Sequence, residues 1–269
     1  MSTRVVDRPV AAAGHSLTDP VFLELAWSRI QAVLDESEIT LMRTAFSPIL
    51  REAYDYGIVL LDELGGAVAQ SQMSMPGFVG TLPRSLKSFL GEYPIGEWRP
   101  GDIFITNDPW IGSGHLPDVT MIRPIFHLQK LVAFMGCIAH WADMGGRMWS
   151  ADSKELFEEG LQIPVARLYS GGEMNRDVVN FILRNVRLPE QVNGDMHAQI
   201  SSINVGANRF IELLKDMVLE DPAPLFAEMR ARSEKAMRDA IRALPEGSYG
   251  HSIQIDGMAG EELLVLKCV

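Results

Sequence analysis

Cysteine is scarce in this sequence. The 269 residues include two cysteines, Cys137 and Cys268, and neither has a second cysteine nearby. A metal site of the CxxC type is therefore excluded, and a disulfide framework is not expected. Because Cys137 lies inside the apolar run 131–139, we expect it to be a small buried hydrophobic residue.

Long apolar runs and an excess of basic residues are also missing. The longest strongly apolar stretch, LVAFMGCIA, has nine residues, whereas a membrane-spanning helix needs about 20. The first residues contain no apolar segment long enough for a signal peptide, so we expect a cytoplasmic protein that does not span a membrane. A formal net charge of −11 repels phosphate backbones, and we expect no nucleic-acid partner.

Nucleotide-binding motifs are absent as well. The sequence contains no GxxxxGK[ST], no GxGxxG after a predicted strand and no GxSxG elbow. Any ATP that the protein needs must therefore be bound by another chain. The sequence does contain 47% hydrophobic and 22% charged residues, the composition of a globular protein with a buried core.

The order of the predicted elements indicates an α+β fold. Asp19-Pro20 predicts the start of a long amphipathic helix that ends near Ser47-Pro48, and a short helix is expected near 84–89. Strand patterns with turn residues between them occur at 56–62, 67–70, 103–106, 119–126 and 131–139. Helical apolar spacing then covers 175–186, 189–220 and 222–244, and strand patterns return at 251–256 and 262–269.

Two loops carry a histidine followed three residues later by an aspartate. His115 and Asp118 lie in the loop before strand 119–126, and His140 and Asp143 follow strand 131–139. As an antiparallel pair, these strands bring both loops to the same end of the sheet. Imidazoles and carboxylates together suit Zn²⁺, Mn²⁺ or Fe²⁺ and leave a position open for water. Spacing alone leaves two interpretations equally open, a metal site and ordinary turn roles for the aspartates.

These elements divide the chain into four regions. They are an N-terminal extension (1–18), a β-rich metal-site region (19–165), a helical region (166–247) and the start of a further β region (248–269). In the last region, Leu263–Leu266 indicates a buried strand that ends without a turn or polar tail, which leaves an unpaired edge. We therefore expect the chain to be the N-terminal part of a larger subunit, or its missing half to be supplied by another chain.

At the two histidine loops the sequence resembles the hydantoinase B/oxoprolinase family. The resemblance is carried by NDP…GxHxxD over 107–118, by HxxDxGG over 140–146, and by the stretches SPILREAYDYGIVLLDELGGAVAQ, EEGLQIPVARLY and GDMHAQISSINVGANRFIELL. This family includes B subunits of ATP-dependent hydantoinases, the related half of 5-oxoprolinase, and subunits of caprolactamase and of acetone and acetophenone carboxylases. Its members are considerably longer than this chain. Many of them read Pro-x-His-x-Gly where this sequence has Pro76-Gly77-Phe78-Val79-Gly80.

The resemblance implies a divalent metal held by four side chains: Asp55, His115, Asp118 and His140. It places Asp143 nearby, as a support or as the general base. Asp108 is predicted to orient a ligand imidazole through a hydrogen bond, although an aspartate before Pro109 is also a natural turn residue. Arg147 is predicted to bind a substrate carboxylate or phosphate, or else to be a solvated surface arginine.

The activity implied by the resemblance is ATP-dependent hydrolysis of a small cyclic amide such as hydantoin, 5-oxoproline or a lactam. A hydantoinase A-type partner chain holds ATP and phosphorylates the carbonyl oxygen, and hydroxide from the metal site attacks the activated carbon. A hetero-oligomer of A-type and B-type chains is therefore expected. The alternatives are a subunit of an ATP-dependent ketone carboxylase and a non-catalytic assembly subunit.

Overall fold

The computed structural model describes residues 19–112, 114–147, 153–257 and 263–269. The predicted N-terminal extension, residues 1–18, lies outside the described residues. The chain divides into two compact units, Met1–Met229 and Arg230–Val269. The predicted metal-site residues all belong to the first unit.

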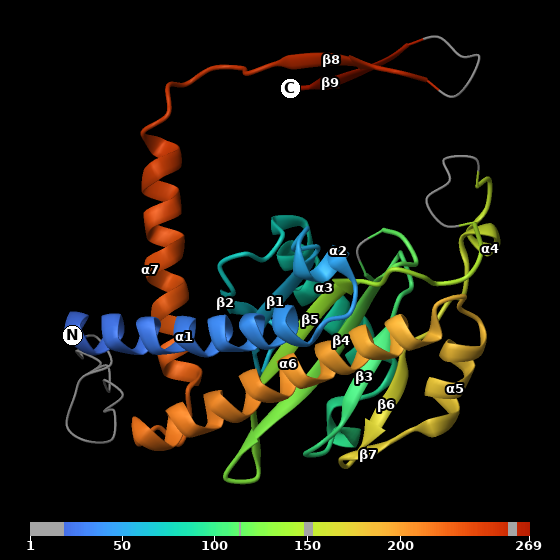
Figure 1. Ribbon diagram of the computed structural model, residues 1–269. Coiled ribbons are helices and arrows are strands. Elements are labelled where there is room, and N and C mark those ends of the chain that lie inside the picture. The colour runs from blue at the N-terminus through green and yellow to red at the C-terminus, as the bar shows by residue number, and fades with distance from the viewer. Residues whose placement is uncertain (1–18, 113, 148–152, 258–262) are drawn as a thin grey trace. The chain divides into compact units, whose positions relative to one another are not determined.

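The first unit is built around one antiparallel sheet with the strand order β2-β1-β5-β4-β3-β6-β7 (Figure 1). Its strands are β1 (Tyr56–Asp62), β2 (Ala67–Gln70), β3 (Ile103–Thr106), β4 (Asp118–His127), β5 (Lys130–His140), β6 (Ala166–Ser170) and β7 (Glu173–Met174). The central strands β4 and β5 are buried along most of their length. Strands that are apolar at successive positions need cover on both faces of the sheet.

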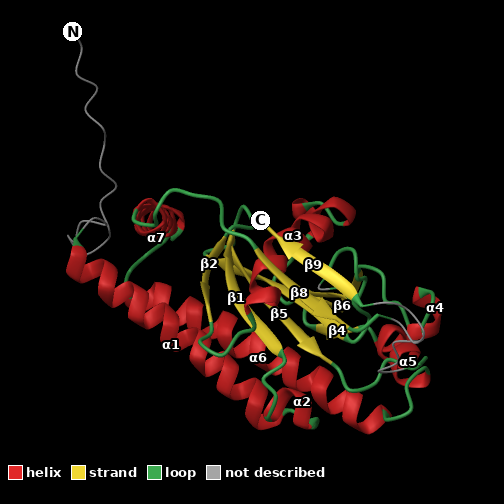
Figure 2. Ribbon diagram, turned by 90° about the horizontal axis from the view of Figure 1, so that it is seen from above, coloured by secondary structure: helices red, strands yellow, loops and turns green. Residues whose placement is uncertain are grey.

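Helices supply that cover on the two faces (Figure 2). On one face, α1 (Pro20–Thr44) and α6 (Pro189–Asp216) pack against each other, and α6 also packs against β4 and β5. On the other face, α3 (Pro76–Glu92) packs against β1 and β5. The shorter helices are α2 (Pro48–Arg51), η1 (Ile95–Glu97), α4 (Leu156–Glu159) and α5 (Arg176–Arg184). The predicted α+β class is confirmed.

The first helix begins where the sequence predicts. The Asp19 side chain accepts a hydrogen bond from Val21 N at 3.0 Å, and Pro20 occupies the first helical position, where a missing N–H costs no hydrogen bond. The helix ends at Thr44, and Ser47 then caps the short helix α2. Cys137 is buried and Cys268 is exposed, and both are free thiols.

Two parts of the chain differ in extent from the expectation. The helix expected near 84–89 is part of the longer helix α3, which begins at Pro76 because proline is favoured in the first turn of a helix. Pro83 lies inside α3, where it has no N–H to donate to the carbonyl four residues earlier. The region 166–247, expected to be helical, begins with β6 and β7, because β6 pairs with β3 and extends the sheet.

In the second unit, β8 (His251–Ile255) and β9 (Leu264–Cys268) form a two-stranded antiparallel sheet. The segment expected to be a buried strand is half exposed in this unit, with Leu264 at 48% and Leu266 at 51%. Among the described residues, β9 pairs only with β8, so no further strand protects its other edge. The remaining helix, α7 (Ala223–Arg242), begins in the first unit and continues into the second.

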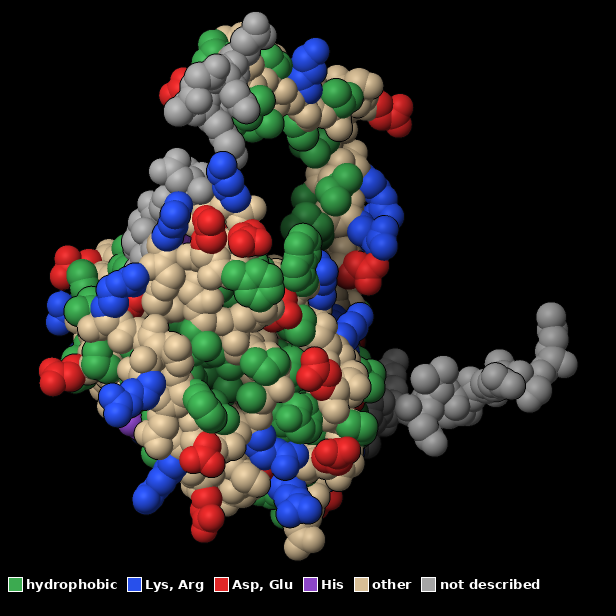
Figure 3. All heavy atoms as spheres, turned by 90° about the vertical axis from the view of Figure 1, so that its right-hand side faces the viewer, with side chains coloured by type: hydrophobic (Ala, Val, Ile, Leu, Met, Phe, Trp, Pro, Cys, Tyr) green, Lys and Arg blue, Asp and Glu red, His purple; other side chains and the backbone are tan. Residues whose placement is uncertain are grey.

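The described residues contain no helix that is long and apolar enough to cross a membrane. On the face seen in Figure 3, Lys and Arg side chains are interspersed with Asp and Glu and form no continuous basic surface. The expected cytoplasmic location stays a prediction.

Candidate metal centre

Three adjacent strands bring three of the predicted ligands into one row. Asp118 on β4 lies directly opposite His140 on β5 in the strand register. On the other side of β5, His140 N donates to Asp55 O at 3.0 Å, which extends the β1–β5 ladder by one residue. Cross-strand neighbours of this kind point to the same face of a sheet. The prediction that the two loops meet at one end of the sheet is therefore confirmed for His140 and Asp118.

The face that carries these ligands is the one covered by α3. Successive strand residues point to opposite faces, and the neighbours Tyr56, Val119 and Ala139 belong to the core cluster that includes residues of α1 and α6. The side chains of Asp55, Asp118 and His140 therefore point away from α6.

His115 reaches the row from the loop before β4. The Asn107 side chain holds this loop, because its Nδ2 donates to Leu116 O at 2.8 Å and to Leu161 O at 2.9 Å. Next to it, Trp141 N donates to Pro117 O at 2.8 Å and fastens the loop to the end of β5. These bonds place the His115 imidazole beside Asp118.

Asp118 is the centre of the cluster. Its Oδ1 lies 3.0 Å from both His115 Nε2 and His140 Nδ1. Asp55 Oδ2 lies 3.6 Å from His140 Nδ1, and ligand atoms of His115, Asp118 and His140 all lie within 4.8 Å of one another. The two imidazoles and the Asp118 carboxylate converge, and the Asp55 carboxylate lies beside them; this donor set fits one Zn²⁺, Mn²⁺ or Fe²⁺ ion.

Burial differs across the cluster. Asp118 and His140 are buried, whereas the side chain of His115 is 45% exposed. Burial raises the pKa of Asp55, while the positive charge of a protonated His140 lowers it and the negative charge of Asp118 raises it. The hydrogen bond to Asp118 raises the pKa of His115 and burial lowers it. The neighbouring carboxylates of Asp55 and Asp118 therefore favour a positive charge between them, which a divalent cation would supply.

Asp143 has other partners. Its buried carboxylate accepts hydrogen bonds from Gly145 N at 2.9 Å, from Leu188 N at 2.8 Å and from Arg187 N. These bonds fasten the loop after β5 to the start of α6. Asp143 is not in the group of side chains whose ligand atoms converge, and its predicted role as general base stays a prediction.

Asp108 and Arg147 also make local contacts. Asp108 Oδ1 accepts a hydrogen bond from Trp110 N at 2.9 Å, so its carboxylate closes its own turn. This contact matches the turn interpretation that the sequence left open. Arg147 is exposed and its Nη1 lies 3.8 Å from Glu158 Oε2. Contact of either residue with an imidazole or a substrate stays a prediction.

Glycines let the loop after β5 pack closely against a second segment. Gly146 and Gly160 have φ values of +53° and +143°, which residues with a side chain rarely adopt. A Cβ on Gly146 would lie 2.3 Å from Glu159 C, and one on Gly160 would lie 2.2 Å from Met144 O. The two glycines therefore allow backbone contact between residues 144–147 and 158–161, which is supported by the 2.7 Å bond from Leu161 N to Met144 O.

Gln199 is a further polar residue near the cluster, and the sequence pattern did not identify it. This residue is fully buried on α6 and hydrogen-bonded to Trp141, the residue after His140. A polar residue at a buried position of an amphipathic helix is the signal that could have identified it, since such residues need partners.

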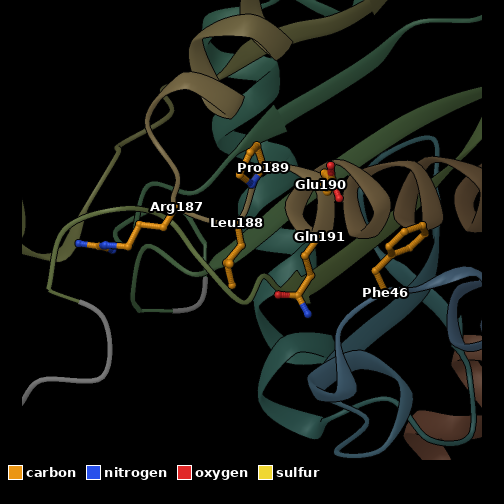
Figure 4. Close-up of a pocket in the computed structure, with 6 residues that line it drawn as sticks. All are labelled: Phe46, Arg187, Leu188, Pro189, Glu190 and Gln191. Carbon is orange, nitrogen blue, oxygen red and sulfur yellow. The ribbon is translucent and has the colours of Figure 1, made fainter.

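A cavity of about 480 Å³ lies at the start of α6 (Figure 4). Its lining residues are Phe46, Arg187, Leu188, Pro189, Glu190 and Gln191. None of the four predicted metal ligands lines it. The cavity is connected to the loop after β5 through Arg187 and Leu188, whose backbones bond to Asp143.

Comparison with known proteins shows to which protein family the chain belongs. The sequence profile described as hydantoinase B/oxoprolinase matches residues 19–266, nearly the whole chain. The chain belongs to this family. The predicted resemblance is therefore confirmed.

Individual relatives agree with this assignment. A candidate D-/L-hydantoinase B subunit of Pseudomonas sp. (strain NS671) is 33% identical over 245 residues, which cover 89% of this chain and 41% of the relative. The caprolactamase beta subunit of Pseudomonas jessenii is 31% identical over 234 residues, which cover 86% of this chain and 40% of the relative. This family member thus spans about two fifths of the length of these relatives.

Two solved structures share the fold. The crystal structure of the ATP-dependent caprolactamase from Pseudomonas jessenii matches with a TM-score of 0.81 at 30% identity, over 88% of this chain and 41% of that one. A nucleotide-free acetone carboxylase structure matches with a TM-score of 0.70 at 20% identity, over 82% of this chain and 33% of that one. The second likeness shows the fold alone.

Proposed function

We propose that this chain is the metal-binding part of the B subunit of an ATP-dependent hydrolase that opens small cyclic amides. The observation that carries the proposal is the convergence of His115, Asp118 and His140, with Asp55 beside them, in a member of the hydantoinase B/oxoprolinase family. We propose hydantoin, 5-oxoproline or a lactam as the substrate. The use of ATP is proposed because the caprolactamase relative is described as ATP-dependent.

Four side chains would hold the metal: Asp55, His115, Asp118 and His140. A divalent ion bound there would lower the pKa of coordinated water and polarise a carbonyl oxygen. Asp118 keeps both imidazoles oriented, because one of its oxygens lies 3.0 Å from a nitrogen of each. The half-exposed His115 lies on the open side of the cluster, where substrate would enter.

ATP enters this proposal through another chain. The amide carbonyl of an unstrained ring is a poor electrophile, and phosphorylation of its oxygen makes the carbon reactive. This chain has no phosphate-binding motif, so we assign the phosphorylation to a hydantoinase A-type partner in a hetero-oligomer. The relatives, which are named as B and beta subunits, support such a partnership.

Asp143 and Asp108 have positioning roles in this proposal. Asp143 fixes the loop after β5 to the start of α6 through Gly145 and Leu188, and Asp108 closes the turn at the start of the His115 loop. Arg147 remains our candidate for contact with a substrate carboxylate or phosphate, since it is exposed.

A ketone carboxylase is the second candidate function, because the acetone carboxylase structure has the same fold. The hydrolase is favoured because sequence identity is 30% to caprolactamase and 20% to acetone carboxylase. Bicarbonate separates the two: a carboxylase consumes ATP productively only when bicarbonate is present, whereas a hydrolase opens its ring without it.

The experiment uses the complex of this chain with its A-type partner. We would measure ATP-dependent ring opening for a panel of hydantoin, 5-oxoproline and lactams, with and without bicarbonate. The double variant His115→Ala/His140→Ala should lose ring opening, whereas His197→Ala, at a histidine of α6 outside the cluster, should keep it. Ring opening that survives in the double variant would contradict the proposal.

A further inference from the structure

Gln199 connects α6 to both strands that carry the buried ligands. Its Nε2 donates hydrogen bonds to Val119 O on β4 and to Cys137 O on β5, each at 2.9 Å. Its Oε1 accepts a hydrogen bond from Trp141 Nε1 at 3.1 Å. Every polar group of this fully buried amide is therefore used.

Two of the three partners of Gln199 lie next to predicted ligands in the chain, and the third, Cys137, precedes His140 by three residues on β5. Val119 follows Asp118 and Trp141 follows His140. Because neighbouring strand residues point to opposite faces, the amide contacts the strands from the α6 side while the ligand side chains point to the α3 side. Gln199 therefore fixes the backbone next to Asp118 and His140 from the face of the sheet that is opposite to their side chains.

The chemistry of the three partners requires an amide at this position. Two of them are carbonyl oxygens, which only accept, and the third is an indole N–H, which only donates. A carboxylate would place negative charge against the two carbonyls, and an aliphatic side chain would satisfy none of the three groups. Hydrogen bonds to the side chains of metal ligands raise metal affinity by about 10–100-fold, and we expect a smaller effect in the same direction from bonds that fix the backbone beside the ligands.

We propose that Gln199 is a positioning residue of the metal centre, which sets the spacing of Asp118 and His140 by clamping β4, β5 and Trp141. This inference rests on the proposed metal site. It predicts that loss of the amide weakens metal binding without removing any ligand.

The test is the dissociation constant of Zn²⁺, measured by calorimetry on the full chain after dialysis against a chelator. Gln199→Met keeps the length of the side chain and removes the amide, and should raise Kd by up to about tenfold, the lower end of the range for direct partners of metal ligands. Ser202→Ala is the matched control, because Ser202 is buried on the same helix but bonds to Ser37 on α1. This control should keep the Kd of the wild type, and the thermal midpoints of both variants would be recorded.

A second readout follows Trp141 directly. The indole N–H signal of Trp141, identified by its loss in Trp141→Phe, should shift in ¹⁵N-NMR spectra when Zn²⁺ is added to the wild type. It should not shift in His115→Ala. If Gln199→Met does not fold, Trp141→Phe takes its place and should also raise Kd, because Oε1 of Gln199 loses its donor.

The outcomes separate this inference from the proposed function. Zn²⁺ binding that needs His115 but is unchanged in folded Gln199→Met overturns the inference and leaves the metal site standing. An equal rise of Kd in Ser202→Ala also overturns it, because the effect is then general destabilisation. A wild-type chain that binds none of Zn²⁺, Mn²⁺ and Fe²⁺ in the same measurement overturns both proposals.

Discussion

Among single residues, Asp118 has the largest influence on the site. One of its oxygens lies 3.0 Å from His115 Nε2 and from His140 Nδ1. Such a shared contact fixes the tautomer and the ring orientation of both imidazoles. It also makes the protonation of the exposed His115 depend on a buried carboxylate.

The first prediction concerns the pKa of His115 in the metal-free chain. The hydrogen bond to Asp118 raises this pKa above the ordinary value of 6.5, so Asp118→Asn should lower it. By linkage, the stabilisation from this pair is fully present below pH 6.5 in the wild type and is lost as the pH rises through the raised pKa. Imidazole signals followed by NMR across a pH titration would measure the change.

Asp143→Asn is the matched control for this titration. Its carboxylate bonds to backbone groups of Gly145 and Leu188, so the pKa of His115 should stay at its wild-type value. A pKa of His115 that is the same in Asp118→Asn and in the wild type would contradict the geometry described above.

Among the elements, the loop after β5 depends on a close backbone contact with the segment after α4. Gly160 has a φ of +143°. A Cβ added to Gly160 would lie only 2.2 Å from Met144 O. A side chain there must displace backbone. The loop carries Asp143 at its start, so its shape matters for the site.

The second prediction compares two glycines with positive φ. Gly160→Ala should lower the free energy of unfolding by more than about 2 kcal/mol, because strain of the backbone and a steric clash add. Gly171 has a φ of +59° and open space around its Cβ position, so Gly171→Ala should cost about 1 kcal/mol. Urea unfolding of both variants measures the difference, and equal losses would show that the contact with Met144 contributes nothing.

Most helices and strands can be predicted from the sequence. The prediction fails for elements whose conformation depends on pairing or packing with segments far away in the chain. The strands β1 to β5 have strong local patterns, and α1 has a cap and a proline at its start. By contrast, β6 is a strand because β3 offers it an edge, and no local pattern reports that edge. The helix α3 contains Pro83 and two early glycines, so its length depends on packing against β1 and β5.

For the site, the sequence predicts the residues that share a loop or a strand end. His115, Asp118 and His140 converge because β4 and β5 are neighbours joined by a short turn. The bonds of Asp143 to Arg187 and Leu188 span 44 and 45 positions in the chain, and those of Gln199 span 58 to 80, so the sequence could not predict them. Such contacts arise only when α6 has packed on the sheet.

In the whole molecule, the candidate metal centre belongs to one compact unit that ends at Met229. The side chains of Leu225, Phe226 and Met229 on α7 are buried in its core. The four predicted ligands all precede Met229, so none of them comes from the second unit.

The third prediction follows from this division. A chain that ends at Met229 should unfold cooperatively and bind the same amount of metal as the full chain. A chain that ends at Pro222 loses three large core side chains, and should be less stable by several kcal/mol because each such loss costs about 2–5 kcal/mol. Thermal melts and metal analysis of the two truncated chains provide the measurement, and loss of metal in the Met229 chain would place part of the site in the second unit.

The most direct measurement is the metal content of the purified chain after dialysis, determined by elemental analysis for the wild type and for His115→Ala. We predict about one equivalent of Zn, Mn or Fe per wild-type chain, as expected for one cluster of imidazoles and carboxylates, and its loss in the variant. His197→Ala, at a histidine of α6 outside the group of converging ligand atoms, should keep the metal. A wild-type chain without metal, or a His115→Ala chain that retains it, would contradict the metal centre described above.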